Sequence, residues 1–437
     1  MEKQKRIHFI GCMGVSMQKL LSIAKGRGDI VTGSDALLNG HDKNNIHKEL
    51  DLVVFSAAIG DDNEELARAK ELGIRLMTRG EFLGEVMSGF DTSIGIGGAH
   101  GKTTTTAMMA SVLKGLDPCV HIGVDEPPPS NDEKNPLPPK IFITEACEYK
   151  KSFLHLSPDI AIVLNMDLDH TDCYQNIEEA HLAFCEFANR AKKLAIVGDG
   201  CQCTGHSAKA KRIIKVGLKK SCDIRAGLLR YDEEGCYSYC LFIDKKWRGR
   251  IRLNIKGKHN VLNSLFVIAA ALELGLSLEE IKKGLAEFKG IGRRLEKIGE
   301  LRGSAIYSDY AHHPSEIDCT IASMRECKYE KLVICFEPHT YTRTASFYKE
   351  FALSLSKADK VILLPIFAAR EQKIEGIESQ LIEKELKKLG HMPICIDDYM
   401  SVCQYLNTYP LDSGSAIVFM GAGTIDGAAR DFVGCSI

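Results

Sequence analysis

The chain lacks an apolar run long enough to cross a membrane. Its best candidate, residues 261–276, is interrupted by Asn263 and Glu273, whereas a spanning helix needs about 20 predominantly apolar residues. The N-terminal residues are polar and lead directly into a strand-like segment at 7–10, without the apolar core of a signal peptide. We therefore expect a cytoplasmic protein without membrane insertion.

A large excess of one charge is also missing. With 56 Lys and Arg against 58 Asp and Glu, the formal net charge is −2, which gives no reason to expect nucleic acid or an anionic membrane as partner. The hydrophobic fraction of 45% is that of an ordinary globular protein. A chain of 437 residues can form about three domains.

The 16 cysteines lack the regular spacing of a disulfide framework, which favours reduced thiols. The segment Cys201-x-Cys203-x-x-His206 could belong to a metal site, but it has no second pair of ligands at a suitable distance. Free surface thiols are therefore the favoured interpretation.

A regular alternation of apolar runs and helical patterns is present, and it is typical of α/β proteins with parallel sheets. We predict three domains: a Rossmann-like domain over residues 1–90, a central ATP-binding α/β domain over 91–292 and a second Rossmann-like domain over 293–437. The first glycine turn, at 11–14, matches the dinucleotide pattern poorly. An NAD site is thus not favoured, whereas a site for another nucleotide stays open. The expected strands are residues 7–10, 29–33, 52–56, 74–77, 92–96, 141–145, 160–165, 305–307, 332–336, 360–364 and 416–420.

The most informative segment is Gly-Ala-His-Gly-Lys-Thr-Thr-Thr at 98–105, between an expected strand and a helical pattern. Backbone N–H groups at such a turn hold phosphates, Lys102 can reach the outer phosphates, and the Thr103 hydroxyl can ligate Mg²⁺. The first glycine of the general phosphate-loop pattern falls on Ile96, but glycines surround that position. The predicted ATP-binding residues are Gly98, Ala99, His100, Gly101, Lys102, Thr103 and Thr104.

An acidic residue and a histidine follow the next two expected strands. Glu145 ends the strand at 141–145, and His170 lies in the loop after 160–165. Open α/β sheets bind ligands at these carboxyl ends, and carboxylate and imidazole groups there suit Mg²⁺ or Mn²⁺. Taken singly, Glu145 could be a helix N-cap and His170 an ordinary loop residue. Together with the phosphate loop, Thr103, Glu145 and His170 are predicted metal ligands.

Two later loops, 308–316 and 337–344, concentrate Asp, His and Arg directly after expected strands. Such loops suit a small charged substrate, although by pattern alone either could be an ordinary turn whose polar groups are hydrogen-bonded.

Several motifs of the chain occur in the order found in Mur ligases, which the chain therefore resembles. These motifs are residues 98–105, Glu145-Ala-Cys-Glu-Tyr149, Asn165 with Asp169-His170-x-Asp172, His259-Asn260-x-x-Asn263, Gly292-Arg-Arg294, Asp309-Tyr-Ala-His-His-Pro314 and Pro338-His-x-Tyr-Thr-Arg-Thr344.

The last three motifs are typical of the branch of this family that adds L-alanine to UDP-N-acetylmuramate, a step of peptidoglycan synthesis. The resemblance implies an ATP-dependent ligase that works through an acyl phosphate with Mg²⁺ or Mn²⁺, as a monomer or homodimer. The implied catalytic residues are Lys102, Glu145, His170, Asn260, Asn263, Arg294 and Asp309. The implied substrate-binding residues are Gly11, Gly14, Ser34, Asp35 and Arg79 for the UDP-sugar, and Tyr310, His312, His339 and Arg343 for the muramate and alanine end. Alternatives are a ligase that attaches a murein tripeptide to the same sugar acid in recycling, and a non-catalytic nucleotide-binding homologue.

Overall fold

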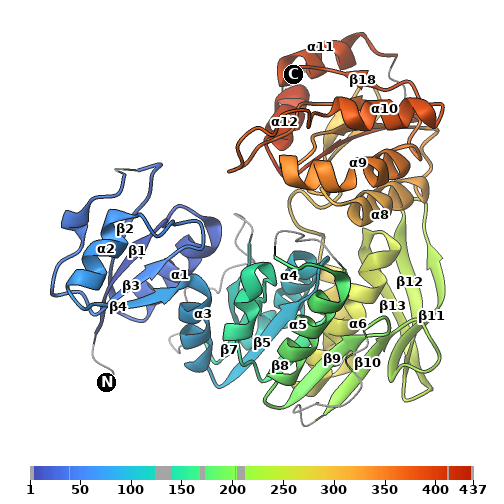
Figure 1. The fold of residues 1–437 in the computed structure, drawn as a ribbon. Helices are drawn as coiled ribbons and strands as arrows, with labels where there is room; N and C mark the ends of the chain where they lie inside the picture. Colours follow the sequence, from blue (N-terminus) through green and yellow to red (C-terminus); the bar gives the residue numbers. More distant parts are fainter. Residues whose placement is uncertain are drawn as a thin grey trace. The chain divides into compact units, whose positions relative to one another are not determined.

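The computed structural model describes residues 4–38, 40–123, 139–167, 173–201, 203, 212–410 and 413–434. The chain divides into two compact units, the first made of Met1–Asp223 and Phe266–Ser277 and the second of Ile224–Leu265 and Leu278–Ile437. The boundary passes through helix α6 (Lys258–Glu273). Figure 1 follows the chain from blue at the N-terminus to red at the C-terminus.

The first unit begins with a parallel sheet in the order β2-β1-β3-β4. Its strands are β1 (Arg6–Ile10), β2 (Ile30–Ser34), β3 (Leu52–Phe55) and β4 (Arg75–Thr78). Helices α1 (Val15–Gly26), α2 (Glu64–Glu71) and α3 (Arg79–Ser88) alternate with these strands, and the 3₁₀ turn η1 (Lys43–Asn45) precedes β3. The βαβ organisation expected for this part of the chain is confirmed.

A second parallel sheet follows in the order β10-β9-β8-β5-β7-β6. Its strands are β5 (Thr92–Gly97), β6 (Cys119–His121), β7 (Ile141–Glu145), β8 (Ile160–Val163), β9 (Leu194–Gly198) and β10 (Ile213–Gly217). Helices α4 (Lys102–Val112) and α5 (Ile177–Asn189) and the 3₁₀ turns η2 (Lys114–Leu116) and η3 (Tyr149–His155) connect them. The proline-rich segment at 126–139 lies outside the described residues, apart from Pro139.

Two glycines of β5 let a helix pack closely on the strand that leads to the phosphate loop. A Cβ on Gly95 or Gly97 would lie 3.1 Å from the ring of Phe187. Phe187 belongs to α5, is fully buried and stacks on Phe153 with ring centroids 5.1 Å apart. These two glycines therefore serve the packing of α5 on β5.

The second unit opens with the antiparallel strands β11 (Ile224–Tyr231), β12 (Cys236–Ile243) and β13 (Lys246–Lys256), in the order β13-β12-β11. These three strands were not predicted from the sequence. Polar and charged residues alternate with apolar ones in β13, because one face of this strand is exposed. Helix α7 (Leu278–Glu287) lies against β13.

The C-terminal sheet has the order β14-β15-β19-β16-β17-β18 in the described residues. Its strands are β14 (Glu296–Leu301), β15 (Ser304–Asp309), β16 (Lys331–Phe336), β17 (Lys360–Leu363), β18 (Ile394–Cys395) and β19 (Ser415–Met420). β14 pairs antiparallel and the others parallel. The helices are α8 (Pro314–Arg325), α9 (Tyr341–Leu355), α10 (Gln380–Lys388), α11 (Tyr399–Thr408) and α12 (Ile425–Gly434). Side chains of α8, α9 and α10 fill one core cluster, and those of α11 and α12 fill another.

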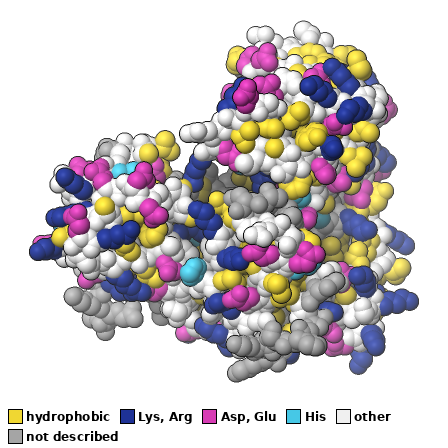
Figure 2. All heavy atoms as spheres, viewed as in Figure 1, with side chains coloured by type: hydrophobic (Ala, Val, Ile, Leu, Met, Phe, Trp, Pro, Cys, Tyr) yellow, Lys and Arg dark blue, Asp and Glu magenta, His cyan; other side chains and the backbone are white. Residues whose placement is uncertain are grey.

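Surface charge is mixed in sign. On the face drawn in Figure 2, Lys and Arg side chains are interspersed with Asp and Glu, in keeping with the small net charge of −2. Across the described ranges, no helix combines the length and apolarity that a membrane span requires.

The contact between α3 and η3 depends on a glycine. A Cβ on Gly84 would lie 2.5 Å from the backbone oxygen of His155, too close for any side chain. We expect Gly84→Ala to lower the free energy of unfolding by about 2 kcal/mol, because the helix must shift. Gly26→Ala in α1 is the matched control, since nothing lies within 4 Å of its added Cβ. Urea unfolding of both variants measures the difference, and equal stabilities would contradict this account.

Candidate active site

The phosphate loop joins β5 to α4 through two backbone conformations that favour glycine. Gly98 has φ 146° and Gly101, the N-cap of α4, has φ 85°. A Cβ on Gly98 would lie 2.9 Å from the Leu164 Cβ at the end of β8. The loop thus folds directly over the carboxyl edge of the sheet, and it leads into a helix N-terminus of the kind that binds anions.

Lys102 lies folded over this loop. Its Nζ donates to the carbonyl oxygens of Gly98 at 2.6 Å and Ala99 at 3.1 Å, and it forms an ion pair of 2.9 Å with the Glu148 carboxylate. Burial opposes the charge, but Glu148 raises the pKa of Lys102 above its usual value. The lysine is therefore held as a cation beside the loop, and Glu148 is a partner to which the sequence analysis assigned no role.

Two oxygen donors meet next to the loop. The Thr103 hydroxyl donates to Glu145 Oε2 at 3.2 Å, and the Gly123 N–H donates to Glu145 Oε1 at 2.8 Å. Glu145 ends β7, so the carboxylate projects at the carboxyl edge as the sequence predicts. A hydroxyl and a carboxylate suit Mg²⁺, which prefers hard oxygen ligands. His170, the third predicted ligand, lies outside the described residues.

Asn165 fixes the position of His100 in the loop. The His100 N–H donates to the Asn165 side-chain oxygen, and the Asn165 amide donates to the His100 carbonyl, both at 2.9 Å. His100 Nε2 also lies 3.3 Å from an oxygen of Asp167. Asn165 was recognised only as part of a motif, because its partner is 65 positions away.

In the first sheet, the predicted UDP-sugar residues cluster where β1 and β2 end. Gly11 has φ 77°, and its N–H donates to the Ser34 carbonyl at 2.9 Å. Asp35 accepts from the Met13 N–H at 2.9 Å, and Gly14 is the N-cap of α1. The structure therefore brings Gly11, Ser34 and Asp35 together around one turn.

Arg79 links this region to the central sheet. Its guanidinium donates to the hydroxyl of Ser16 at 3.0 Å and to that of Ser152 at 3.2 Å. Ser16 also contacts His121 at 2.9 Å, and burial lowers the pKa of His121 to about 3. A neutral imidazole and an arginine therefore share the Ser16 hydroxyl.

A buried carboxylate beneath the Ser34 turn was missed by the sequence analysis. Glu65 of α2 is fully buried and accepts from Ser34 at 2.6 Å, Asn45 at 2.7 Å and His41 at 2.9 Å. Burial opposes its ionisation, but hydrogen bonds from His8, Ser34, Asn45 and His41 lower the pKa of Glu65 to about 2. No motif marks it, because its partners come from separate segments.

In the second unit, the four residues predicted for the muramate and alanine end lie together. His312 Nδ1 is 2.9 Å from the Tyr310 carbonyl oxygen, and the His312 and His339 ring centroids are 5.6 Å apart. Arg343 Nη1 lies 3.1 Å from His339 Nδ1. These side chains follow β15 and β16, neighbours of β19 in the sheet, and they offer imidazole and guanidinium groups to an anionic substrate.

Arg294 and Asp309 occupy the same corner. The Arg294 guanidinium lies 4.9 Å from the centre of the Tyr310 ring and 3.8 Å from Glu316. Asp309 is buried and accepts from the N–H groups of Leu295 at 2.7 Å and Ala311 at 2.9 Å. Burial raises the pKa of Asp309. Through these hydrogen bonds, Asp309 holds the turn that carries Tyr310.

Asn260 and Asn263, two of the implied catalytic residues, form a pair at the start of α6. The Asn263 amide donates to the Asn260 side-chain oxygen at 2.9 Å, and the Asn260 amide donates to the Lys256 carbonyl at 2.7 Å. Both residues are 6% exposed. Each amide is thus oriented by a defined partner.

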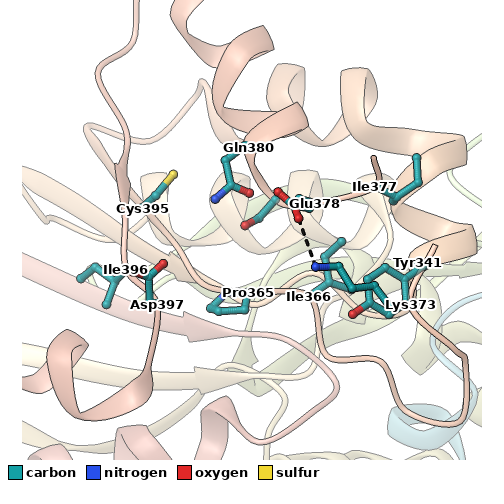
Figure 3. A pocket seen from close by; sticks show the side chains of 11 residues that line it. Tyr341, Pro365, Ile366, Lys373, Ile377, Glu378, Gln380, Cys395, Ile396 and Asp397 are labelled. Atoms are coloured by element: carbon teal, nitrogen blue, oxygen red, sulfur yellow. Dashed lines mark ion pairs between the residues drawn. The ribbon is translucent and has the colours of Figure 1, made fainter. Parts of the chain in front are cut away.

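A pocket of about 200 Å³ opens at the carboxyl ends of β17 and β18. Figure 3 shows an ion pair between two of its lining residues, Lys373 and Glu378, whose charged atoms lie 3.2 Å apart. Tyr341 and Cys395 are among its lining residues. None of the predicted substrate residues lines it, although Tyr341 lies between His339 and Arg343 in the sequence.

The fold and the loop define a phosphate-loop protein with α/β domains of the Rossmann type. Three family models match in succession: the Mur ligase family catalytic domain over residues 6–91, the Mur ligase middle domain over 96–271, and the Mur ligase glutamate ligase domain over 293–423. The chain belongs to the Mur ligase family, whose members are ATP-dependent amide-bond-forming ligases.

Individual relatives are similar over nearly their whole length. A UDP-N-acetylmuramate–L-alanine ligase of Clostridium kluyveri is 37% identical, over 97% of this chain and 96% of that protein. The solved UDP-N-acetylmuramate–alanine ligase of Thermotoga maritima has a TM-score of 0.81 and 26% identity, covering 99% of both chains. A murein peptide ligase of Psychrobacter arcticus has a TM-score of 0.67 and 23% identity over 98% of both chains, which is a likeness of fold.

The stability of the fold should depend on pH through the buried Glu65 carboxylate. The pKa of about 2 in the folded protein lies below the ordinary value of 4.5. Glu65 therefore stabilises the fold above pH 4.5, and this stabilisation is lost as the pH falls through 2. We expect Glu65→Gln to lower the free energy of unfolding by about 3 kcal/mol at neutral pH.

The difference in free energy of unfolding between Glu65→Gln and the wild type should become smaller as the pH is lowered from about 5 towards 2. Urea unfolding over a pH series measures it. The neighbouring Glu64→Gln is the control, because Glu64 is exposed on the same helix. A difference that is constant with pH would contradict the role of the charge.

Proposed function

We propose that this chain joins L-alanine to the carboxylate of UDP-N-acetylmuramate with consumption of ATP. The observation that carries the proposal is the phosphate loop with Lys102, beside the Thr103–Glu145 pair. It occurs in a chain that is similar over nearly its full length to relatives named for that reaction. No disulfide joins cysteines within the described ranges, which fits a reducing compartment, so we propose that the reaction takes place in the cytoplasm.

The proposed reaction activates a poor acyl donor. The muramoyl carboxylate attacks the γ-phosphorus of ATP, which gives an acyl phosphate and ADP. The amine of L-alanine then attacks the acyl carbon, and phosphate leaves the tetrahedral intermediate. Lys102 offers a fixed positive charge where negative charge builds up on the transferred phosphoryl group, so its contribution is positioning and electrostatics.

We assign the metal to Thr103, Glu145 and, on sequence grounds, His170. The Thr103 hydroxyl and the Glu145 carboxylate fit Mg²⁺ because both are hard oxygen donors at the mouth of the phosphate loop. When bound, Mg²⁺ or Mn²⁺ would neutralise charge on the nucleotide phosphates. Gly98, Ala99, His100, Gly101 and Thr104 would complete the phosphate cradle through the backbone.

We divide the other substrate contacts among three domains, residues 1–90, 91–292 and 293–437. The turn formed by Gly11, Gly14, Ser34 and Asp35, with Arg79, would bind the UDP-sugar. Tyr310, His312, His339 and Arg343 would bind the muramate and alanine end, where the guanidinium can pair with a carboxylate. Asn260 and Asn263 would contact adenine, and Arg294 and Asp309 would act near ATP.

A ligase specific for murein tripeptide is the nearest alternative, because it would share the phosphate loop and the sugar. The likeness to the solved murein peptide ligase is weaker than that to the solved alanine ligase, with a TM-score of 0.67 against 0.81. A non-catalytic homologue is disfavoured because Lys102 and Glu145 are both present and lie at the loop.

Amine-dependent phosphate release tests the proposal directly. The purified chain is mixed with ATP, Mg²⁺ and UDP-N-acetylmuramate, and then with L-alanine, with murein tripeptide or with neither. We expect release of phosphate only with L-alanine, because its amine resolves the acyl phosphate. Release that depends on the tripeptide would assign the chain to recycling, and no release with either amine would refute the ligase proposal.

Lys102→Ala removes the cation at the phosphate loop. We expect turnover to fall by more than about 100-fold, because charge on the transferred phosphoryl group loses its partner. Lys114→Ala is the control, since Lys114 is exposed on η2 beyond the same helix. The phosphate-release assay measures both, and a Lys102→Ala variant with near-normal turnover would overturn the assigned role.

A further inference from the structure

Two thiols lie in contact in the central domain. Cys185 of α5 donates to the sulfur of Cys203, beyond the end of β9, with an Sγ–Sγ distance of 3.0 Å. Both side chains are half-buried. The neighbouring Cys201 is 3% exposed, and its Sγ contacts the Val163 carbonyl at 3.8 Å. The expectation of surface thiols is therefore wrong for Cys201, and His206 lies outside the described residues.

The geometry favours a bond between the two sulfurs over a metal site. Within the described residues, no third thiol, imidazole or carboxylate places a ligand atom within 4.8 Å of both sulfurs. A structural metal of the zinc type needs about four such ligands. By contrast, two sulfurs 3.0 Å apart need to approach by only about 1 Å to reach bonding distance.

We propose that Cys185 and Cys203 form a reversible disulfide site that reacts with small-molecule disulfides of the glutathione class. Nothing in the ligase reaction requires these thiols. The proposal is therefore independent of the amine that the enzyme uses.

The exchange balances in two steps. The Cys185 thiolate attacks one sulfur of glutathione disulfide, forming a mixed disulfide and releasing one glutathione thiolate. The Cys203 thiol then loses its proton to solvent and attacks the Cys185 sulfur, which releases the second glutathione. Two electrons pass from the protein dithiol to the oxidant. The same balance holds if Cys203 reacts first and Cys185 resolves the mixed disulfide.

The bond would tie α5 to the segment after β9. Helix α5 supports the strand before the phosphate loop, since Phe187 packs against Gly95 and Gly97. Phe184 on the same helix meets Phe153 with ring centroids 5.4 Å apart. A cross-link at Cys185 therefore restrains α5, the helix that packs against the strand before the phosphate loop. It should raise the temperature of thermal unfolding.

Disulfide mapping tests the pairing. The purified full chain is equilibrated with glutathione buffers from reduced to fully oxidised, free thiols are alkylated, and peptides are identified by mass spectrometry. We expect a linked Cys185–Cys203 peptide that lacks the mass of two hydrogen atoms and disappears with dithiothreitol. Cys185→Ser and Cys203→Ser should each abolish it, whereas Cys319→Ser, at an exposed cysteine, should leave it intact.

Thermal unfolding tests the consequence of the bond. We expect oxidation to raise the Tm of the wild type by roughly 5 °C and to leave that of Cys185→Ser unchanged. The proposal is overturned if both thiols stay alkylatable in glutathione disulfide alone, or if Cys203 pairs with Cys201. It also fails if the linked protein melts at the same temperature as the reduced one.

Discussion

A largely buried positive charge at the phosphate loop is the constraint on which the central domain depends. Removing an ammonium group from water is costly unless it is paired and hydrogen-bonded. Lys102 meets this requirement with two loop carbonyls and the Glu148 carboxylate. The segment carrying Glu148 is held in turn by Tyr174, whose hydroxyl donates to the Glu148 carbonyl at 2.7 Å. The shape of the loop and the path of the chain after β7 thus depend on one another.

The geometry of parallel strands explains where the polar side chains of all three sheets lie. Strands that run in parallel end at a common edge, and the loops there are free to carry polar groups. Gly11 and Asp35 lie at this edge of the first sheet, Glu145 at that of the second, and Tyr310 and His339 at that of the C-terminal sheet. Three domains of ordinary composition can therefore each offer a specialised surface.

Sequence patterns were informative where the signal is local. The strand–glycine loop–helix order around Lys102 and the buried runs of the parallel strands can be read from neighbouring residues. The strands β11, β12 and β13 were missed, because an antiparallel strand with one exposed face resembles a polar connection. Glu65 was missed for a different reason: it sits in an ordinary helix, and only folding brings Ser34, His41 and Asn45 to its carboxylate.

By itself, the sequence determined the α/β class, the phosphate loop and the family, because these depend on hydrophobic periodicity and on motifs of a few adjacent residues. Only the tertiary structure decided which polar groups pair in the interior. The Lys102–Glu148 ion pair joins residues 46 positions apart. Asn165 and His100, which are joined by hydrogen bonds, lie 65 positions apart, and Cys185 and Cys203 lie 18 apart. Such pairings follow from strand order and helix packing, which no local pattern encodes.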